Sequence, residues 1–237
     1  MINLGEETLA SIVTRHQHAA TILEKHHLDF CCKGKRTLYQ ACNEKGIMIE
    51  PVINDLKQAT ENNKNIHNKF DLMNAENLIH YILAKHHSYV KQAMPSILSH
   101  LEKVSAKHGK SFPNMILVFE IFSLIKEELN THMFKEEEML FPRIKELEYL
   151  FTHKINIAFP DSYINDLLAA MELEHHNVGA LLIDIVNLTS DYAIPKEACM
   201  TFKVVLEELK YFEEDLHKHI HLENNVLFPL VKNMVFN

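Results

Sequence analysis

Residues that shape turns and cross-links are scarce in this sequence of 237 residues, which contains five glycines, seven prolines and four cysteines. So few glycines and prolines argue against a β-sandwich or β-barrel, whose many tight turns need them. Four unevenly spaced cysteines argue against the disulfide framework of a small secreted domain. We therefore expect an all-α protein that works in a reducing cytoplasm.

Long hydrophobic runs and excess positive charge are also lacking. No stretch of about 18 uncharged apolar residues is present, so we expect no membrane span. The first residues, MINLGEETLASIVTRHQ, include early acidic side chains and no apolar run of signal-peptide length. A formal net charge of −8 argues against general nucleic-acid binding. We therefore expect neither a membrane nor a nucleic acid among the partners.

The charge divides the chain into two parts. Residues 1–70 hold nine Lys or Arg against eight Asp or Glu, whereas residues 71–237 hold 15 against 24. The polar run TENNKNIHNK, residues 60–69, lies at the division and has the composition of a linker. We expect a small N-terminal helical domain over residues 1–60, a linker over 61–70 and a larger domain over 71–237.

Apolar spacing predicts helices in both parts. In the first part we expect a helix over 6–26, one from an N-cap at Thr37 to a C-cap at Gly46, and one from Pro51 to residue 59. In the second part apolar residues recur every three or four positions in four long segments. These segments are 74–105, 113–148, 163–189 and 195–234. Their lengths and short connections predict an antiparallel four-helix bundle.

Seventeen histidines are the compositional outlier, and two of them lie in a duplicated motif. HMFKEEEMLFP (132–142) and HIHLENNVLFP (219–229) both read H-x3-E-x3-L-F-P. The four-residue step places each histidine and glutamate on one helix face. Together they can supply two ligands to one iron, or one ligand and a bridge between two. A single H-x3-E is usually a surface pair, but two copies in the same apolar frame indicate a metal site.

The other two long segments each carry a histidine pair, His86–His87 and His175–His176. Four helices can thus place four histidines and two carboxylates at a similar depth, which predicts a dinuclear site with iron favoured. Helical periodicity places His86 nearer the apolar stripe than His87. A ferritin-type alternative would use E-x-x-H, and this spacing occurs at Glu172–His175 and Glu214–His217. That alternative does not account for the duplicated motif.

The duplicated motif, with DFCCKG (29–34) and KRTLYQAC (35–42), resembles the RIC family, the hemerythrin-like di-iron proteins for repair of iron centres (YtfE/ScdA). The resemblance implies two non-heme, oxo-bridged irons per chain and favours His87 over His86. It also implies that Glu128 and Glu174 line a solvent path to the metals, while the long connection over 145–165 departs from the family. The ligands that it implies, with both glutamates bridging, are His87, His132, Glu136, His175, His219 and Glu223.

The family resemblance also implies a function. The implied protein acts in the stress response and repairs oxidatively or nitrosatively damaged iron–sulfur clusters of other proteins by supplying iron. The same centre could reduce nitric oxide, so whether the chain is an enzyme stays open. The alternative is a hemerythrin-type carrier or sensor of oxygen or nitric oxide, and a ferritin-type storage bundle is the third hypothesis. Assembly as a homodimer is left open.

The adjacent cysteines, Cys31 and Cys32, are the remaining unusual feature. A disulfide between neighbours strains the backbone, so we expect two thiols. Basic residues follow directly and a helix starts near Thr37, and both features favour thiolate. We therefore predict that the pair relays iron or electrons between the metals and a partner, the alternative being two small buried side chains. We expect Cys199 to be an inert buried thiol.

Overall fold

The computed structural model describes residues 4–16, 18–61, 70, 73–155 and 162–236. Throughout these residues the regular structure is helical, and the nearest approach to a strand is one isolated bridge between Thr8 and Thr37. The prediction of an all-α fold is therefore confirmed. The chain forms two compact units: unit 1 contains 1–80, 147–155 and 217–237, and unit 2 contains 81–146 and 156–216.

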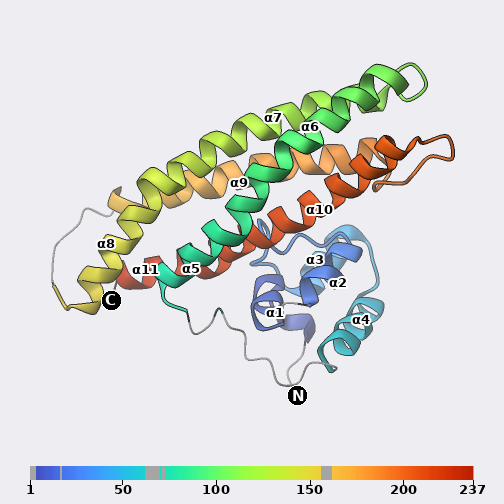
Figure 1. Cartoon of the computed structure of the whole chain (residues 1–237). Helices are drawn as coiled ribbons and strands as arrows, with labels where there is room; N and C mark the ends of the chain where they lie inside the picture. The colour runs from blue at the N-terminus through green and yellow to red at the C-terminus, as the bar shows by residue number, and fades with distance from the viewer. Residues whose placement is uncertain (1–3, 17, 62–69, 71–72, 156–161, 237) are drawn as a thin grey trace. The chain divides into compact units, whose positions relative to one another are not determined.

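Unit 1 holds the N-terminal helices, which are drawn in blue in Figure 1. They are η1 (Leu4–Glu6), α1 (Leu9–Arg15), α2 (Ala19–Lys25), α3 (Leu38–Lys45) and α4 (Ile49–Glu61). The expected single helix over 6–26 is wrong, because the backbone at His16 turns extended (φ −135°, ψ 90°) and separates α1 from α2.

The caps expected around α3 are confirmed. The Thr37 side chain accepts from the backbone N–H of Gln40 in a capping box, and Gly46 ends the helix with φ 67°. Helix α4 starts two residues before Pro51, which lies in its first turn, where a missing N–H costs no hydrogen bond. The expected linker falls mostly outside the described residues.

The long helices of the bundle lie mainly in unit 2, while some of their ends, including all of η4 and α11, belong to unit 1. Helix α5 (Ala75–Ile82) continues through η2 (Leu83–His87) into α6 (Ser88–His108). Helix α7 (Asn114–Lys135) continues through η3 (Glu136–Leu140) into α8 (Phe141–Thr152). Helix α9 (Ser162–Leu188) follows, and α10 (Met200–Leu222) continues through η4 (Glu223–Leu227) into α11 (Phe228–Phe236). Figure 1 shows α7 running along both α6 and α9, and the predicted helical bundle is confirmed. The unit boundary falls inside α5, α8 and α10.

The core of unit 2 consists of one apolar stripe from each helix. On α7 the buried stripe is Met115, Val118, Phe122, Ile125 and Leu129, in alternating steps of three and four. The rings of Phe122 and Phe212 meet edge to face, with centroids 5.2 Å apart. Burial of such a side chain contributes about 1.5–3 kcal/mol, so these stripes fix the rotation of each helix.

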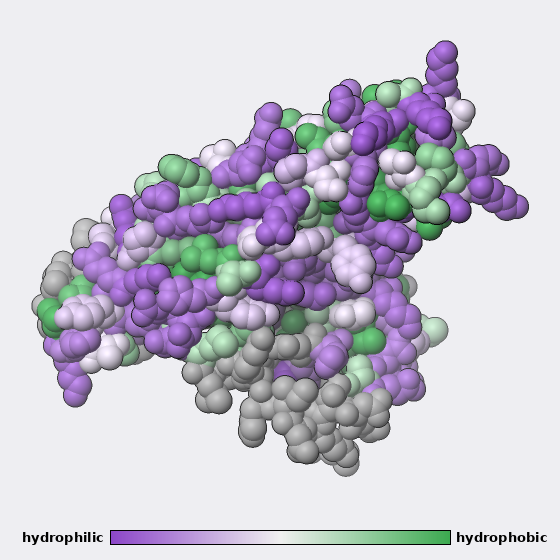
Figure 2. Space-filling model, in the orientation of Figure 1, coloured by the Kyte–Doolittle hydropathy of each residue, from purple (hydrophilic) through white to green (hydrophobic). Residues whose placement is uncertain are grey.

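Polar residues cover the outside of these helices. The face drawn in Figure 2 is mostly hydrophilic, with hydrophobic residues in small groups between. Among the described helices none has the length and apolar character that crossing a membrane requires. In the connection over 145–165, α8 ends at Thr152 and α9 begins at Ser162, while residues 156–161 lie outside the described part.

Candidate metal centre

Three wide π-helical turns carry the histidine and glutamate motifs. Glu136 opens η3 and Glu223 opens η4, while His86 and His87 close η2. In each turn a backbone N–H reaches the carbonyl five residues back, as from Phe141 to Glu136. Such turns occur frequently at functional sites. The periodicity of the sequence did not predict these π turns. Two of the three precede the proline of an L-F-P, which has no N–H to bond the preceding α-helical turn and could have indicated them.

The turn η2 explains why periodicity could not separate His86 from His87. The apolar register of α5 leads from Ile82 to His86, while the register of α6 leads back from Val90 to His87. The extra residue of the π turn joins the two registers, so both histidines are buried, at 4% and 1% exposure. Their partners differ: His86 Nδ1 lies 3.1 Å from Asp215, and His87 Nε2 lies 3.3 Å from Glu136 Oε2.

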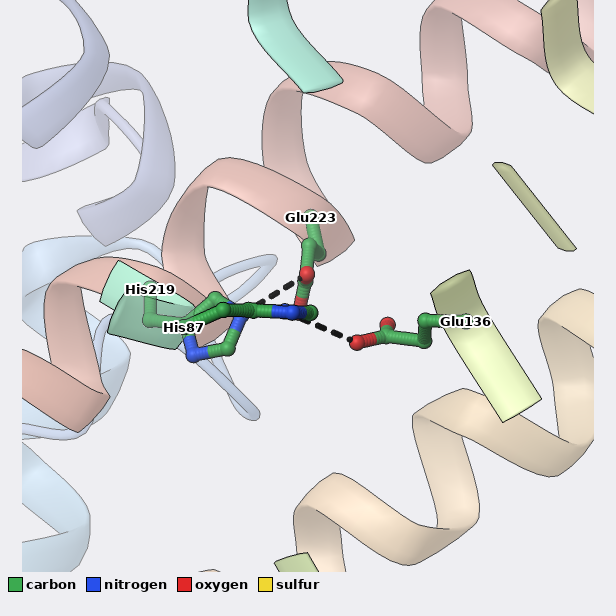
Figure 3. Close-up of side chains that lie close together, drawn as sticks. All are labelled: His87, Glu136, His219 and Glu223. Carbon is green, nitrogen blue, oxygen red and sulfur yellow. Dashed lines mark hydrogen bonds and ion pairs between the residues drawn. The ribbon is translucent and has the colours of Figure 1, made fainter. Parts of the chain in front are cut away.

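In unit 2 the structure brings together four of the predicted ligands. His132 and Glu136 continue the buried stripe of α7, and His175 occupies the equivalent stripe of α9. The ligand atoms of these three residues lie within 4.8 Å of one another, with the two Nε2 atoms of His132 and His175 3.0 Å apart. His87 Nε2 faces the same Glu136 carboxylate (Figure 3). Glu136 is fully buried, a position that a carboxylate rarely takes without a compensating charge.

Two further carboxylates hold the outer nitrogens of these histidines. Glu137 lies 2.7 Å from His87 Nδ1 and also accepts from Lys91. Partial burial opposes ionisation of Glu137, but the hydrogen bonds from Lys91 and His87 outweigh it and lower the pKa of this carboxyl. With the proton on Nδ1, Nε2 is available for a metal. Analysis of the sequence missed this role of Glu137, which in sequence is only one of three consecutive glutamates.

Glu174 repeats the arrangement on the other side of Glu136. Its carboxylate lies 2.9 Å from His132 Nδ1 and accepts from Lys135. The hydrogen bond from His132 is the main reason that the pKa of Glu174 falls to about 2, against the opposing effect of burial. The sequence interpretation gave Glu174 a place on a solvent path; in the structure it orients His132. Glu128 is exposed on α7.

In unit 1 the second copy of the motif forms its own buried pair. His219 Nε2 lies 2.8 Å from Glu223 Oε1, and the side chains are 1% and 0% exposed. Figure 3 draws this pair with a dashed line between its members. The pair continues the stripe of Leu209, Phe212 and Leu216 on α10. The residues of the ferritin-type alternative are placed less favourably, because Glu214 and His217 are only partly buried. Both copies of H-x3-E thus lie at core positions of their helices.

The DFCCKG turn, also in unit 1, holds a small cluster of candidate ligands. Asp29 Oδ1 accepts from the backbone N–H groups of Cys31 and Cys32, and the two sulfurs lie 3.7 Å apart as free thiols. Gly34 closes the turn, and a Cβ there would lie 2.3 Å from the Phe30 carbonyl oxygen. Larger side chains are therefore excluded at this position.

The thiolate prediction is wrong for Cys31. Its hydrogen bond with Cys32, its burial and the Asp29 carboxylate raise the pKa of Cys31 well above the ordinary value. Sequence reasoning relied on the helix that starts after Thr37, but that side chain already caps the helix. It also relied on Lys33, which is exposed, whereas the charged group in contact with the thiol is Asp29. Cys31 is 4% exposed, and Cys32 is half-buried.

The cysteine turn contacts the π turn that begins at Glu223. Asn225 Nδ2 donates to the carbonyl oxygens of Cys31 (3.0 Å) and Phe30 (3.3 Å). The Phe30 ring meets His221 edge to face, with centroids 5.6 Å apart. His221 is buried, and this burial lowers its pKa to about 4, so the ring is neutral. The cysteines and Glu223 are therefore linked through a few direct contacts within one unit.

Comparison with known proteins agrees with this geometry. Residues 5–60 match ScdA_N, described as a domain of unknown function, and residues 78–231 match the hemerythrin HHE cation binding domain. The iron-sulfur cluster repair protein ScdA of Staphylococcus epidermidis is 34% identical over 95% of this chain and 98% of its own length. ScdA of Staphylococcus haemolyticus is 30% identical over 94% and 97%, and YtfE of Yersinia pestis is 31% identical over 94% and 95%. The chain therefore belongs to the ScdA/YtfE family, in which an ScdA_N domain precedes a hemerythrin HHE domain.

Proposed function

We propose that this chain repairs damaged iron–sulfur clusters through a dinuclear, non-heme iron centre in its hemerythrin HHE domain. The observation that carries the proposal is the burial of six motif side chains at core positions, where unbound charge is costly. None of the six is more than 2% exposed. The relatives compared above are named iron-sulfur cluster repair proteins. The proposed ligands are His87, His132, Glu136, His175, His219 and Glu223.

The donor set fits iron. Imidazole and carboxylate together suit iron better than calcium or magnesium, which take oxygen ligands alone. Glu137 and Glu174 keep the proton of two ligands on Nδ1, so that Nε2 is available to the metal. Two cations between the ligand histidines would neutralise the fully buried carboxylates of Glu136 and Glu223.

The proposed stoichiometry of two irons per chain rests on the two glutamates. A buried carboxylate has two oxygens and can bridge two ions, and one glutamate is available from each copy of the motif. Four histidines then leave two for each iron, which keeps positions open on both. Two ferrous ions bound here would supply transferable iron and two electrons. A hemerythrin-type carrier, the alternative, would need an additional histidine on one iron to close its coordination.

The cysteine turn is the proposed point of transfer. Cys31 is protonated and can donate to the sulfur of Cys32, which is the half-buried member of the pair. Thiolate sulfur is a softer iron ligand than imidazole or carboxylate. We propose that Cys32, assisted by Cys31, binds transferred iron or donates electrons, and that Asn225 keeps this turn on the helix segment that bears Glu223.

The proposed partners follow from this chemistry. Damaged iron–sulfur proteins are the repair targets, and nitric oxide and oxygen are small ligands for open iron positions. We propose that the repair takes place in the reducing cytoplasm, where Cys31 and Cys32 remain thiols. Glu128, exposed one turn before His132, is proposed to guide small ions toward the centre.

Ferrous loading under anaerobic conditions, followed by metal analysis and an iron-transfer assay to a cluster-depleted iron–sulfur protein, tests the proposal. We expect two irons per chain and restored cluster activity in the acceptor. The double variant Cys31→Ser/Cys32→Ser should keep both irons but lose most of the transfer. Tight retention of iron with reversible gas binding would identify a carrier instead. Wild-type transfer by the double variant would remove the cysteines from the mechanism.

A further inference from the structure

Cys199 lies beside a histidine in unit 2, away from the proposed ligands in the sequence. Its sulfur is 3.2 Å from Nε2 of His108. Both side chains are half-buried, so the expectation of a buried thiol at this position is wrong. A sulfur and an imidazole nitrogen at this distance can exchange a proton directly.

Both partners of this pair lie at helix ends. Cys199 directly precedes Met200, the first residue of the long helix α10, and its carbonyl accepts from the Lys203 N–H in the first turn. His108 is the last residue of α6. The N-terminal end of a helix stabilises negative charge and the C-terminal end stabilises positive charge. The pair is thus held between the ends of two helices of unit 2.

A cavity of about 380 Å³ adjoins two aromatic rings that contact His108. It is formed by the α6–α7 connection, the α9–α10 connection and one face of α10, and it is lined largely by apolar side chains. Two lining residues, Phe112 and Phe202, also contact the His108 ring, with centroids 6.5 and 5.7 Å away. A mainly apolar space is therefore one side chain away from the His108 ring.

We propose that Cys199 is a site of reversible S-thiolation by low-molecular-weight disulfides, with His108 as the base and the adjoining cavity holding an apolar organic group. His108 Nε2 takes the thiol proton, and the thiolate attacks one sulfur of the disulfide. The new sulfur–sulfur bond forms as the old one breaks, and the released thiolate takes the proton back from the imidazolium. Cys199 is oxidised to the mixed disulfide and the released half of the reagent is reduced to a thiol.

Two of the other cysteines are poorly suited to this reaction. Cys31 is buried, and its hydrogen bond with Cys32 is the leading reason that its pKa is raised. Burial, with Glu50 nearby, raises the pKa of Cys42. A low pKa is what makes a thiol reactive near neutral pH. The inference does not depend on iron binding, because it uses none of the proposed ligands.

The test is the rate of reaction of the full-length, iron-loaded chain with dithiodipyridine, an aromatic disulfide, with the modified residue located by peptide mass spectrometry. We expect Cys199 to react at least about tenfold faster than Cys31 or Cys42, in line with proton transfer by a positioned base. His108→Gln should slow Cys199 about tenfold or more, while the matched control His100→Gln on the same helix should not. The rates in denaturant should be equal in all variants.

A substitution in the cavity lining tests the role of the cavity. Leu206→Trp fills part of the cavity and should slow dithiodipyridine by several fold, while the rate with the small reagent methyl methanethiosulfonate stays unchanged. Circular dichroism verifies that each variant is folded. Equal rates for wild type and His108→Gln would overturn the role of the base. Equal slowing of both reagents by Leu206→Trp would overturn the role of the cavity, and a Cys199 no faster than Cys42 would overturn the site as a whole.

Discussion

Replacement of Glu136 by Gln should change stability in opposite directions in the metal-free and the iron-loaded protein. The carboxylate is fully buried, with His87 Nε2 at 3.3 Å and His132 Nε2 at 3.4 Å. Glutamine has the same shape and no charge. Because an ion buried without full compensation costs several kcal/mol, and the two imidazoles compensate in part, we expect the metal-free variant to be about 1–2 kcal/mol more stable. For a chain of this length that raises Tm by about 3–6 °C.

With iron bound the order should reverse. A ligand at about 100 times its Kd stabilises the folded state by about 2.7 kcal/mol, which the wild type should gain and the variant should lose with the proposed bridging carboxylate. Thermal unfolding followed by circular dichroism, with a chelator and then with anaerobic ferrous ion, measures both effects. The control Glu138→Gln removes an exposed charge from the same π turn and should stay within about 0.5 kcal/mol in either state. A metal-free Glu136→Gln protein that melts below the wild type, or an iron-induced shift that it retains in full, would contradict this prediction.

Three further changes test the surroundings of the proposed centre. Glu174→Gln keeps an acceptor for His132 Nδ1 but loses its charge. It should lower iron affinity about tenfold, measured in competition with a ferrous chelator. Glu128→Gln should leave the affinity unchanged and slow iron delivery. Equal affinity in Glu174→Gln and wild type would contradict the positioning role. Asn225→Ala removes the donor to the Phe30 and Cys31 carbonyls and should lower the free energy of unfolding by about 1–2 kcal/mol, measured in denaturant. Asn224→Ala, whose contact is 3.4 Å long, should lower it less. A truncated chain of residues 71–237 should fold and bind iron, because this segment contains the whole hemerythrin HHE match. It should melt at a lower temperature than the full chain, because it loses the contacts of Asn225. A fragment without helical structure would contradict the proposed domain boundary.

The helices and the burial of the proposed ligand side chains could be predicted from the sequence, because both depend on local spacing. The stripe on α7 runs through Phe122, Ile125 and Leu129 to His132 and Glu136 without a change of step. A histidine in that register must lie on the buried face whichever partner it meets. The same holds for His175 on α9 and for His219 on α10.

The choice between His86 and His87 could not be read from spacing alone. Periodicity assumes one rotation per residue, and the π turn over Leu83–His87 breaks that assumption. Both residues are buried, and only their partners across the fold, Asp215 and Glu136, tell them apart. The family resemblance favoured His87, and the position of its Nε2 beside Glu136 agrees with that choice.

The sequence by itself determined the all-α class, the helix stripes and the duplicated H-x3-E motif, because each of these is a property of residues within a few positions of one another. Tertiary structure alone decided the protonation of Cys31, the hydrogen bond of Asn225 to its carbonyl and the pairing of His108 with Cys199. Asn225 and Cys31 are 194 residues apart, and His108 and Cys199 are 91 apart. Protonation and hydrogen bonding depend on the groups within a few ångströms, and folding brings these together from segments whose sequence spacing carries no trace of the contact.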